Sequence, residues 1–173
     1  VELAALPLRS WKTQNVADSA EMKMRWFGPE FDSGDVDQAA VIADYRRHVA
    51  QLGARASDSI GELLHTHLHD ARVRQWAMDG TVFTWSLVIG DLERGYEQVT
   101  IEYRDATLRS ATTAELIDFD LCDPEHELVS DEIDAVAGGP RLEQRFAFWP
   151  GFTFAIEFSD VGMAREPIRD RSA

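Results

Sequence analysis

Hydrophobic residues change their spacing along the chain, from a helical period in the first part to strict alternation in the second. Residues 36–52 contain no glycine or proline. Within this stretch, the apolar residues at the spacing of one helix face are Ile42, Tyr45, Val49 and Leu52. The pattern predicts one long helix before the strand-rich part.

Polar residues and glycine at the ends of this stretch predict where the helix begins and stops. Asp35 can accept hydrogen bonds from the free amides of a first turn, and Gly53 can adopt the left-handed conformation that ends a helix. Ser59 and Glu62 have the spacing of a capping box just before Leu63 and Leu64, which predicts a second, short helix.

In the second part of the chain, apolar and polar residues alternate, which is typical of strands with one buried face. The clearest alternating positions are Phe83, Trp85, Leu87 and Ile89, then Val99, Ile101 and Tyr103, then Leu142, Phe146 and Phe148, and then Phe152, Phe154, Ile156 and Phe158. The Asp79-Gly80 pair predicts a two-residue type I′ turn between the first two strands. We also expect a short helix at 113–117 and a further strand near 127–136.

These elements belong to the α+β class, with an antiparallel meander of about six strands packed against the one long N-terminal helix. With 173 residues, of which 45% are hydrophobic, the chain suits a single domain with one core. We expect four parts within this domain, 1–173: an irregular segment at 1–34, helices at 35–68, the antiparallel sheet at 70–163 and a loosely held charged tail at 164–173.

Acidic residues outnumber basic ones, 31 to 17, which gives a formal net charge of -14. This charge repels phosphate backbones and anionic lipid surfaces, so we predict neither nucleic acid nor a membrane as a partner. It attracts basic proteins. The single Cys122 can form no internal disulfide, and the sequence shows no signal-like leader and no long apolar run, so we expect a cytoplasmic protein.

Three histidines, His65, His67 and His69, stand directly before Asp70 at the start of the first predicted strand. In an extended segment they would point to one face, where three imidazoles could bind zinc. The cluster has some likeness to the His-x-His-x-Asp-His run of metallo-β-lactamase-type hydrolases, with the last two residues reversed. We favour a structural interpretation, in which His65 and His67 are exposed while His69 and Asp70 bond backbone groups where the strand begins.

A second group of candidate residues is acidic and consists of Asp118, Asp120, Asp123 and Glu125. Clustered carboxylates suit calcium, but Asp123 stands where an EF-hand loop needs glycine, and Val129 stands where it needs its last glutamate. We therefore expect an acidic connecting loop that faces a basic partner.

The sequence contains no motif that names a reaction. It has no Gly-x-Ser-x-Gly, no Walker A loop and no Gly-x-Gly-x-x-Gly, so we predict no catalytic residue and no cofactor. Binding is therefore favoured over enzymatic activity.

The stretch Leu68-His69-Asp70-Ala71, between the predicted helix and the meander, resembles a group of uncharacterised bacterial domain families built on a Leu-His-Asp-Ala strand. The runs Asp131-Glu132-Ile133 and Ile156-Glu157-Phe158 are similar to that group as well, so that the resemblance covers roughly residues 36–163. Its motif does not include His65 and His67. Some relatives of this kind resemble immunity proteins of toxin systems.

Charge, motifs and resemblance together lead to one prediction and two alternatives. We predict a bacterial protein that acts by contact with another protein, of the type of an immunity inhibitor that binds a basic toxin. The first alternative is a metal-binding protein or metal-dependent hydrolase that uses the His65–Asp70 cluster. The second is a structural module without a ligand.

Overall fold

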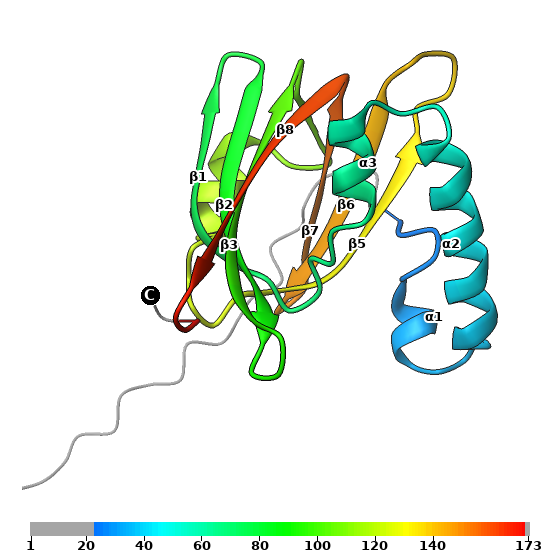
Figure 1. The fold of residues 1–173 in the computed structure, drawn as a ribbon, viewed down its shortest axis with the longest axis horizontal. Coiled ribbons are helices and arrows are strands. Elements are labelled where there is room, and N and C mark those ends of the chain that lie inside the picture. Colours follow the sequence, from blue (N-terminus) through cyan, green and yellow to red (C-terminus); the bar gives the residue numbers. More distant parts are fainter. Residues whose placement is uncertain (1–22, 172–173) are drawn as a thin grey trace, which may run out of the picture.

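The computed structural model describes residues 23–171, apart from the side chains of Pro29 and Asp32. Its strands form two four-stranded antiparallel sheets that face each other, with the orders β1-β2-β3-β8 and β4-β7-β6-β5 (Figure 1). The strands are β1 (Arg72–Asp79), β2 (Val82–Asp91), β3 (Gly95–Arg104), β4 (Thr107–Arg109), β5 (Glu127–Ala135), β6 (Leu142–Trp149), β7 (Phe152–Phe158) and β8 (Asp160–Ile168). The α+β class is confirmed, whereas the single six-stranded meander is wrong.

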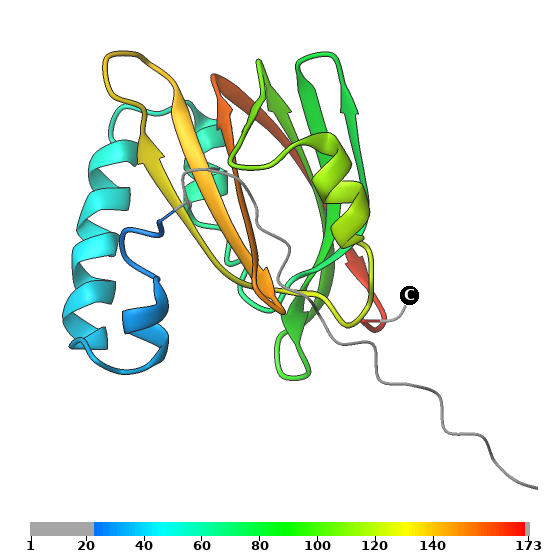
Figure 2. The same ribbon diagram turned by 180° about the vertical axis from the view of Figure 1, so that it is seen from behind.

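Four helices accompany the sheets: α1 (Pro29–Asp32), α2 (Gln38–Gly53), α3 (Asp58–Leu64) and α4 (Thr113–Phe119). Figures 1 and 2 show α2 and α4 at opposite sides of the two sheets. No helix within residues 23–171 is long and apolar enough to cross a membrane.

The space between the sheets is filled by aromatic side chains, as the alternating positions predict. The fully buried rings come from β2 and β3 on one side and from β6 and β7 on the other; they are Phe83, Trp85, Tyr103, Phe146, Phe154 and Phe158. Trp85 and Phe146 meet edge to face across the two sheets, with ring centroids 4.7 Å apart. Through this aromatic core, the two sheets pack against each other as two layers.

Both predicted N-caps lie two residues away from the residues that cap the helices. The side chain of Asp37 accepts from the Ala40 amide at 3.1 Å, so α2 begins after Asp37. Asp35 instead accepts a hydrogen bond from the Ser33 hydroxyl at 2.6 Å. Ser57, rather than Ser59, caps α3.

The predicted end of α2 is also corrected. Gly53 lies within the helix, and the C-cap Ala54 has right-handed backbone angles. The Arg55 and Ala56 amides donate to the oxygens of Leu52 and Gly53, and no residue from 53 to 57 has a positive φ.

The long helix does not cover a sheet face, which corrects the predicted packing. α2 lies beside β5, at the edge of its sheet, and contributes no fully buried residue (Figures 1 and 2). It contacts Trp26, whose ring centroid is 5.1 Å from that of Tyr45 and 4.5 Å from that of His48. Tyr45 and His48 also hydrogen-bond the backbone of Ile133 in β5.

The first hairpin forms one residue later than predicted. Asp79 pairs with Val82, so Gly80 and Thr81 occupy the two-residue turn. Gly80 has φ +58, while Thr81 has no positive φ, a pattern that fits a type II′ turn better than type I′. The glycine therefore supplies the conformation that the sequence predicted, at the neighbouring turn position.

The predicted loose tail is a strand over much of its length. β8 pairs with β3 from Asp160 to Ile168, and Arg165 forms ion pairs with Glu62 and Glu97. β8 is an edge strand on which only Val161 is buried, so its sequence lacks the apolar alternation that predicts strands.

The predicted short helix is confirmed as α4, which lies between β4 and β5 in the chain. Thr112 and Glu115 form a complete capping box at its start. The sequence missed the short strand β4, which pairs with β7 over only three residues.

Candidate ligand-binding site

The histidine segment crosses from α3 to β1 and presents all three of its rings to solvent. His65 is the C-cap residue of α3, and both His65 and His67 are exposed. His69 Nδ1 contacts the backbone oxygen of Val129. Within residues 23–171, no group of three or more His, Cys, Asp or Glu side chains could hold a metal ion, so the geometry gives the metal alternative no support.

Asp70 contributes its backbone to the strand junction, and its side chain does not bond a backbone group as predicted. The Asp70 amide donates to the Leu128 oxygen at 2.8 Å, and its own oxygen accepts from Arg171. The carboxylate is 62% exposed and lies 3.4 Å from His69 Nε2. Asp70 also has φ 61, in the left-handed region that Asp tolerates better than most residues.

The predicted acidic loop is partly helical. Asp118 lies in α4, and Asp120 is its left-handed C-cap. Asp123 accepts from the Glu125 amide at 2.8 Å. The side chains of Asp118, Asp120 and Glu125 are exposed, so this segment presents negative charge to solvent.

The inner side of the histidine segment lines a pocket of about 610 Å³ that the sequence did not reveal. Its walls come from the segment with α1, from α2, from the end of α3 with the following histidine segment, and from β5. They are mainly apolar: Phe27, Phe31, Ile42, Val49, Ala50, Leu63, Leu64, Leu68, Val129 and Ile133. The exposed Arg46, His65 and His67 also belong to the lining and therefore stand at its rim.

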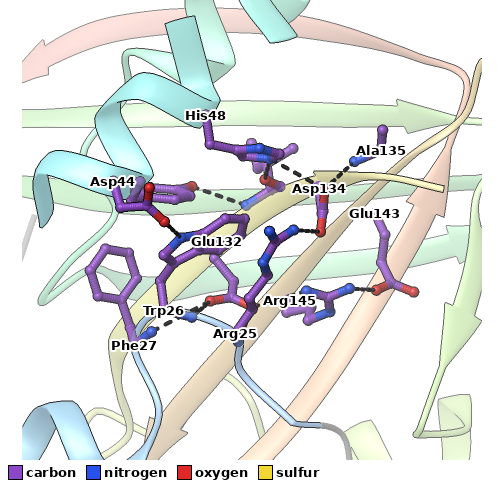
Figure 3. A network of polar contacts seen from close by, with 12 residues as sticks. Arg25, Trp26, Phe27, Asp44, His48, Glu132, Asp134, Ala135, Glu143 and Arg145 are labelled. Carbon is purple, nitrogen blue, oxygen red and sulfur yellow. Dashed lines mark hydrogen bonds and ion pairs between the residues drawn. The ribbon is translucent and has the colours of Figure 1, made fainter. Parts of the chain in front are cut away.

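The pocket exists because β5 is the last strand of its sheet and α2 stands away from it. On one side, Trp26 packs on Tyr45 and His48 of α2, and its amide donates to Glu132 of β5 (Figure 3). A register irregularity between Leu128 and Ser130 bends β5 where its residues join the pocket wall. Beyond these contacts, side chains from the two elements line the hollow.

Asp131 is the only acidic residue among the described residues that line this pocket. Gln144 Nε2 donates to Asp131 Oδ2 at 2.7 Å, and the Gln144 amide oxygen accepts from the Tyr103 hydroxyl at 2.8 Å. Tyr103 and Gln144 are both fully buried, so the aromatic core fixes the orientation of the carboxyl group.

Burial raises the pKa of Asp131 to about 6, and the negative charge of Glu132 contributes to the rise, while the Gln144 hydrogen bond and His69 oppose it. The carboxyl group is therefore mainly ionised at neutral pH and becomes protonated in mildly acidic solution.

Tyr45 places a neutral hydroxyl close to the same wall. The Ile133 amide donates to the Tyr45 oxygen at 3.0 Å. Burial, together with the negative charge of Asp131, raises the pKa of Tyr45 far above its ordinary value, so the phenol keeps its proton.

The opposite face of β5 carries a second buried carboxylate, Glu132, which fixes the segment that leads into the pocket wall (Figure 3). It accepts from the amides of Arg25 at 2.6 Å and Trp26 at 2.8 Å, and it pairs with the guanidinium of Arg145 at 3.0 Å. These bonds hold the backbone directly before Phe27, whose side chain lines the pocket.

One weak signal for this arrangement is present in the sequence. Asp131-Glu132-Ile133 places two acidic residues inside a predicted strand, where charges are uncommon unless they have partners. The partners lie far away in the chain, so the signal did not identify the site.

Comparison of the chain with protein-family models, with curated proteins and with solved structures gives no match. The resemblance to Leu-His-Asp-Ala families therefore stays a prediction, and the function is argued from the geometry of the site.

Proposed function

We propose that this protein binds a small, mainly apolar molecule in the pocket between α2, the histidine segment and β5. The observation that carries the proposal is the pocket itself, about 610 Å³ in volume, with apolar walls and one oriented carboxyl group. Sites for small molecules usually have volumes of roughly 300 to 1,000 Å³, apolar walls and a few fixed polar groups. The pocket has each of these properties.

The contacts in the pocket favour binding over covalent catalysis. Among its described lining residues, no serine or threonine hydroxyl is hydrogen-bonded to a histidine or a carboxylate, as an activated nucleophile would be. Thr66, for example, donates to the backbone oxygen of Glu62. Asp131 is held by the neutral amide of Gln144, which orients the carboxyl group without activating a nucleophile.

A fluorescent apolar probe tests the proposal. N-phenylnaphthylamine, which is uncharged and fluoresces when it leaves water, should bind the wild-type protein with saturable fluorescence. Val49→Trp should weaken binding about ten-fold or more, because the indole fills the pocket that Val49 lines. Ala43→Trp is the matched control, since Ala43 is exposed on the same helix and does not line the pocket.

Two results would contradict this function. Wild-type protein without saturable probe fluorescence would show that the pocket takes no apolar molecule. Equal weakening by Val49→Trp and Ala43→Trp would show that the probe binds elsewhere on α2.

Contact with a basic protein is a second candidate, which the negative charge favours. The net charge of -14 and the exposed carboxylates of Asp118, Asp120 and Glu125 support it. In this hypothesis the chain is a cytoplasmic bacterial protein of the immunity type. The double variant Asp118→Lys and Glu125→Lys should weaken the binding of a basic partner and leave the melting temperature nearly unchanged. A partner that binds this variant as well as the wild type would place the contact elsewhere.

A further inference from the structure

Asp131 is an incompletely paired carboxyl group at the wall of the pocket. Its Oδ2 atom accepts from Gln144, whereas Oδ1 has no hydrogen-bond partner among residues 23–171. No ion pair to Asp131 is formed within this part of the chain either. A half-buried carboxylate in this state gains free energy from any cation that reaches its free oxygen.

The groups around Asp131 do not supply that cation. From β5 itself comes the negative Glu132, and from β6 and β3 come the neutral Gln144 and Tyr103. From α2, the neutral phenol of Tyr45 lies on the same wall.

The basic residues on the lining are exposed. His69 lowers the pKa of Asp131 but bonds the Val129 oxygen through Nδ1. The side chains of Arg46, His65 and His67 are exposed at the rim. An anionic ligand would therefore find its partners only at the rim, whereas a cationic one finds Asp131 against the apolar wall.

We propose that the ligand of this pocket is an amphipathic amine, whose protonated nitrogen pairs with Asp131 Oδ1 while its apolar body lies between α2 and β5. This inference rests on the proposed function and specifies its ligand class. A charge-assisted bond from an ammonium group to a carboxylate is about twice as strong as a neutral hydrogen bond, and the apolar surroundings strengthen it. Gln144 keeps the carboxyl group in place before the ligand arrives.

Three small molecules with the same apolar body and different charges test which charge the pocket prefers. Phenylbutylamine, phenylbutanol and phenylbutyrate are each titrated against bound N-phenylnaphthylamine at about pH 7.5. We expect the amine to displace the probe at a concentration at least about ten-fold lower than the alcohol, and the acid to be the weakest competitor. This preference for the amine should disappear as the pH falls to about 5, because protonated Asp131 no longer attracts a cation.

A pair of variants locates the charge that is responsible. Asp131→Asn should bind the probe like the wild type, because the side chain keeps its size. The amine and the alcohol should displace the probe from this variant at equal concentrations, because the charge is lost. Asp118→Asn makes the same change on exposed α4 and should retain the full amine preference. Probe binding by each variant shows that its pocket is folded.

The outcomes separate this inference from the proposed function. A wild-type pocket that binds the probe but prefers the alcohol or the acid overturns the amine assignment and leaves the pocket function intact. A pocket that does not bind the probe at all overturns both. An amine preference that survives in Asp131→Asn also overturns the assignment, since another group must then recognise the nitrogen.

Discussion

The two faces of β5 bury neighbouring carboxyl groups in opposite ways. On the outer face, Glu132 is fully buried, accepts from consecutive backbone amides and pairs with Arg145. On the inner face, Asp131 has a single neutral donor, Gln144, and borders a pocket. One strand thus carries one carboxylate whose charge is compensated and one whose charge is not.

This difference separates a structural carboxylate from an available one. Burial removes the hydration of Glu132. This residue stabilises the fold only because its hydrogen bonds and ion pair replace that hydration. Asp131 lacks such partners, so its ionisation opposes folding and favours a ligand that supplies a positive charge. Burial alone therefore does not indicate function; the number and charge of the partners do.

The largest expected effect comes from removing the compensated group. Glu132→Ala leaves Arg145 and the amides of Arg25 and Trp26 without their acceptor, and we expect a loss of about 3 to 5 kcal/mol in the free energy of unfolding. Urea denaturation measures it. Glu132→Gln, which keeps an acceptor, should lose less, and a Glu132→Ala protein as stable as the wild type would refute the structural role.

Neutralising Asp131 should have the opposite sign. Its folded-state pKa of about 6 is raised above the ordinary 3.8, so the stability linked to this group is present below about pH 4 and is lost as the pH rises through 6. The rise corresponds to at most about 3 kcal/mol. Asp131→Asn should therefore stabilise the fold by about 1 to 3 kcal/mol at neutral pH and by almost nothing at about pH 4.

Urea denaturation of the wild type and of Asp131→Asn at both pH values checks this prediction. If the variant has the same advantage at neutral and at acidic pH, its effect comes from packing and the ionisation of Asp131 costs the fold nothing.

The smallest effect is expected at the edge of the outer network. Arg25 pairs with Asp134 at 3.1 Å, and its side chain is 57% exposed, with the guanidinium 4.3 Å from the centroid of the Trp26 ring. Arg25→Ala keeps the backbone amide that bonds Glu132, so we expect a loss of only about 0.5 to 1 kcal/mol by thermal unfolding. A loss comparable to that of Glu132→Ala would mean that the Arg25 side chain, and not the buried carboxylate, fixes this segment.

The sequence predicted those strands that have one buried face and missed those that lack it. β2, β3, β6 and β7 carry the alternating aromatic and aliphatic residues of the core, so their positions follow from periodicity. The exposed edge strand β8 contains Arg165, Glu166 and Pro167, and this charged sequence predicted a tail. The strand nevertheless pairs with β3 from Tyr96 to Arg104. Pairing of an edge strand depends on the backbone of its neighbour, which side-chain patterns do not encode.

The candidate site was less predictable than the fold, because its parts are distant in sequence. The sequence indicated His65, His67, His69 and the acidic residues near the end of α4, because these form clusters of neighbouring residues in the chain. The polar group on the pocket wall is instead Asp131, which Gln144, a polar residue of β6, holds in place. Only the packing of β5, β6 and α2 brings their environment together, and no local pattern indicates it.

The loose attachment of α2 has a consequence for how a molecule reaches Asp131. No side chain of α2 is fully buried, so separating this helix exposes less apolar surface than separating the two sheets. Opening of this wall therefore costs less free energy than global unfolding, and it leaves both sheets intact. Separation of α2 is therefore a second route, beside the rim, by which the pocket's contents exchange with solvent while the aromatic core stays packed.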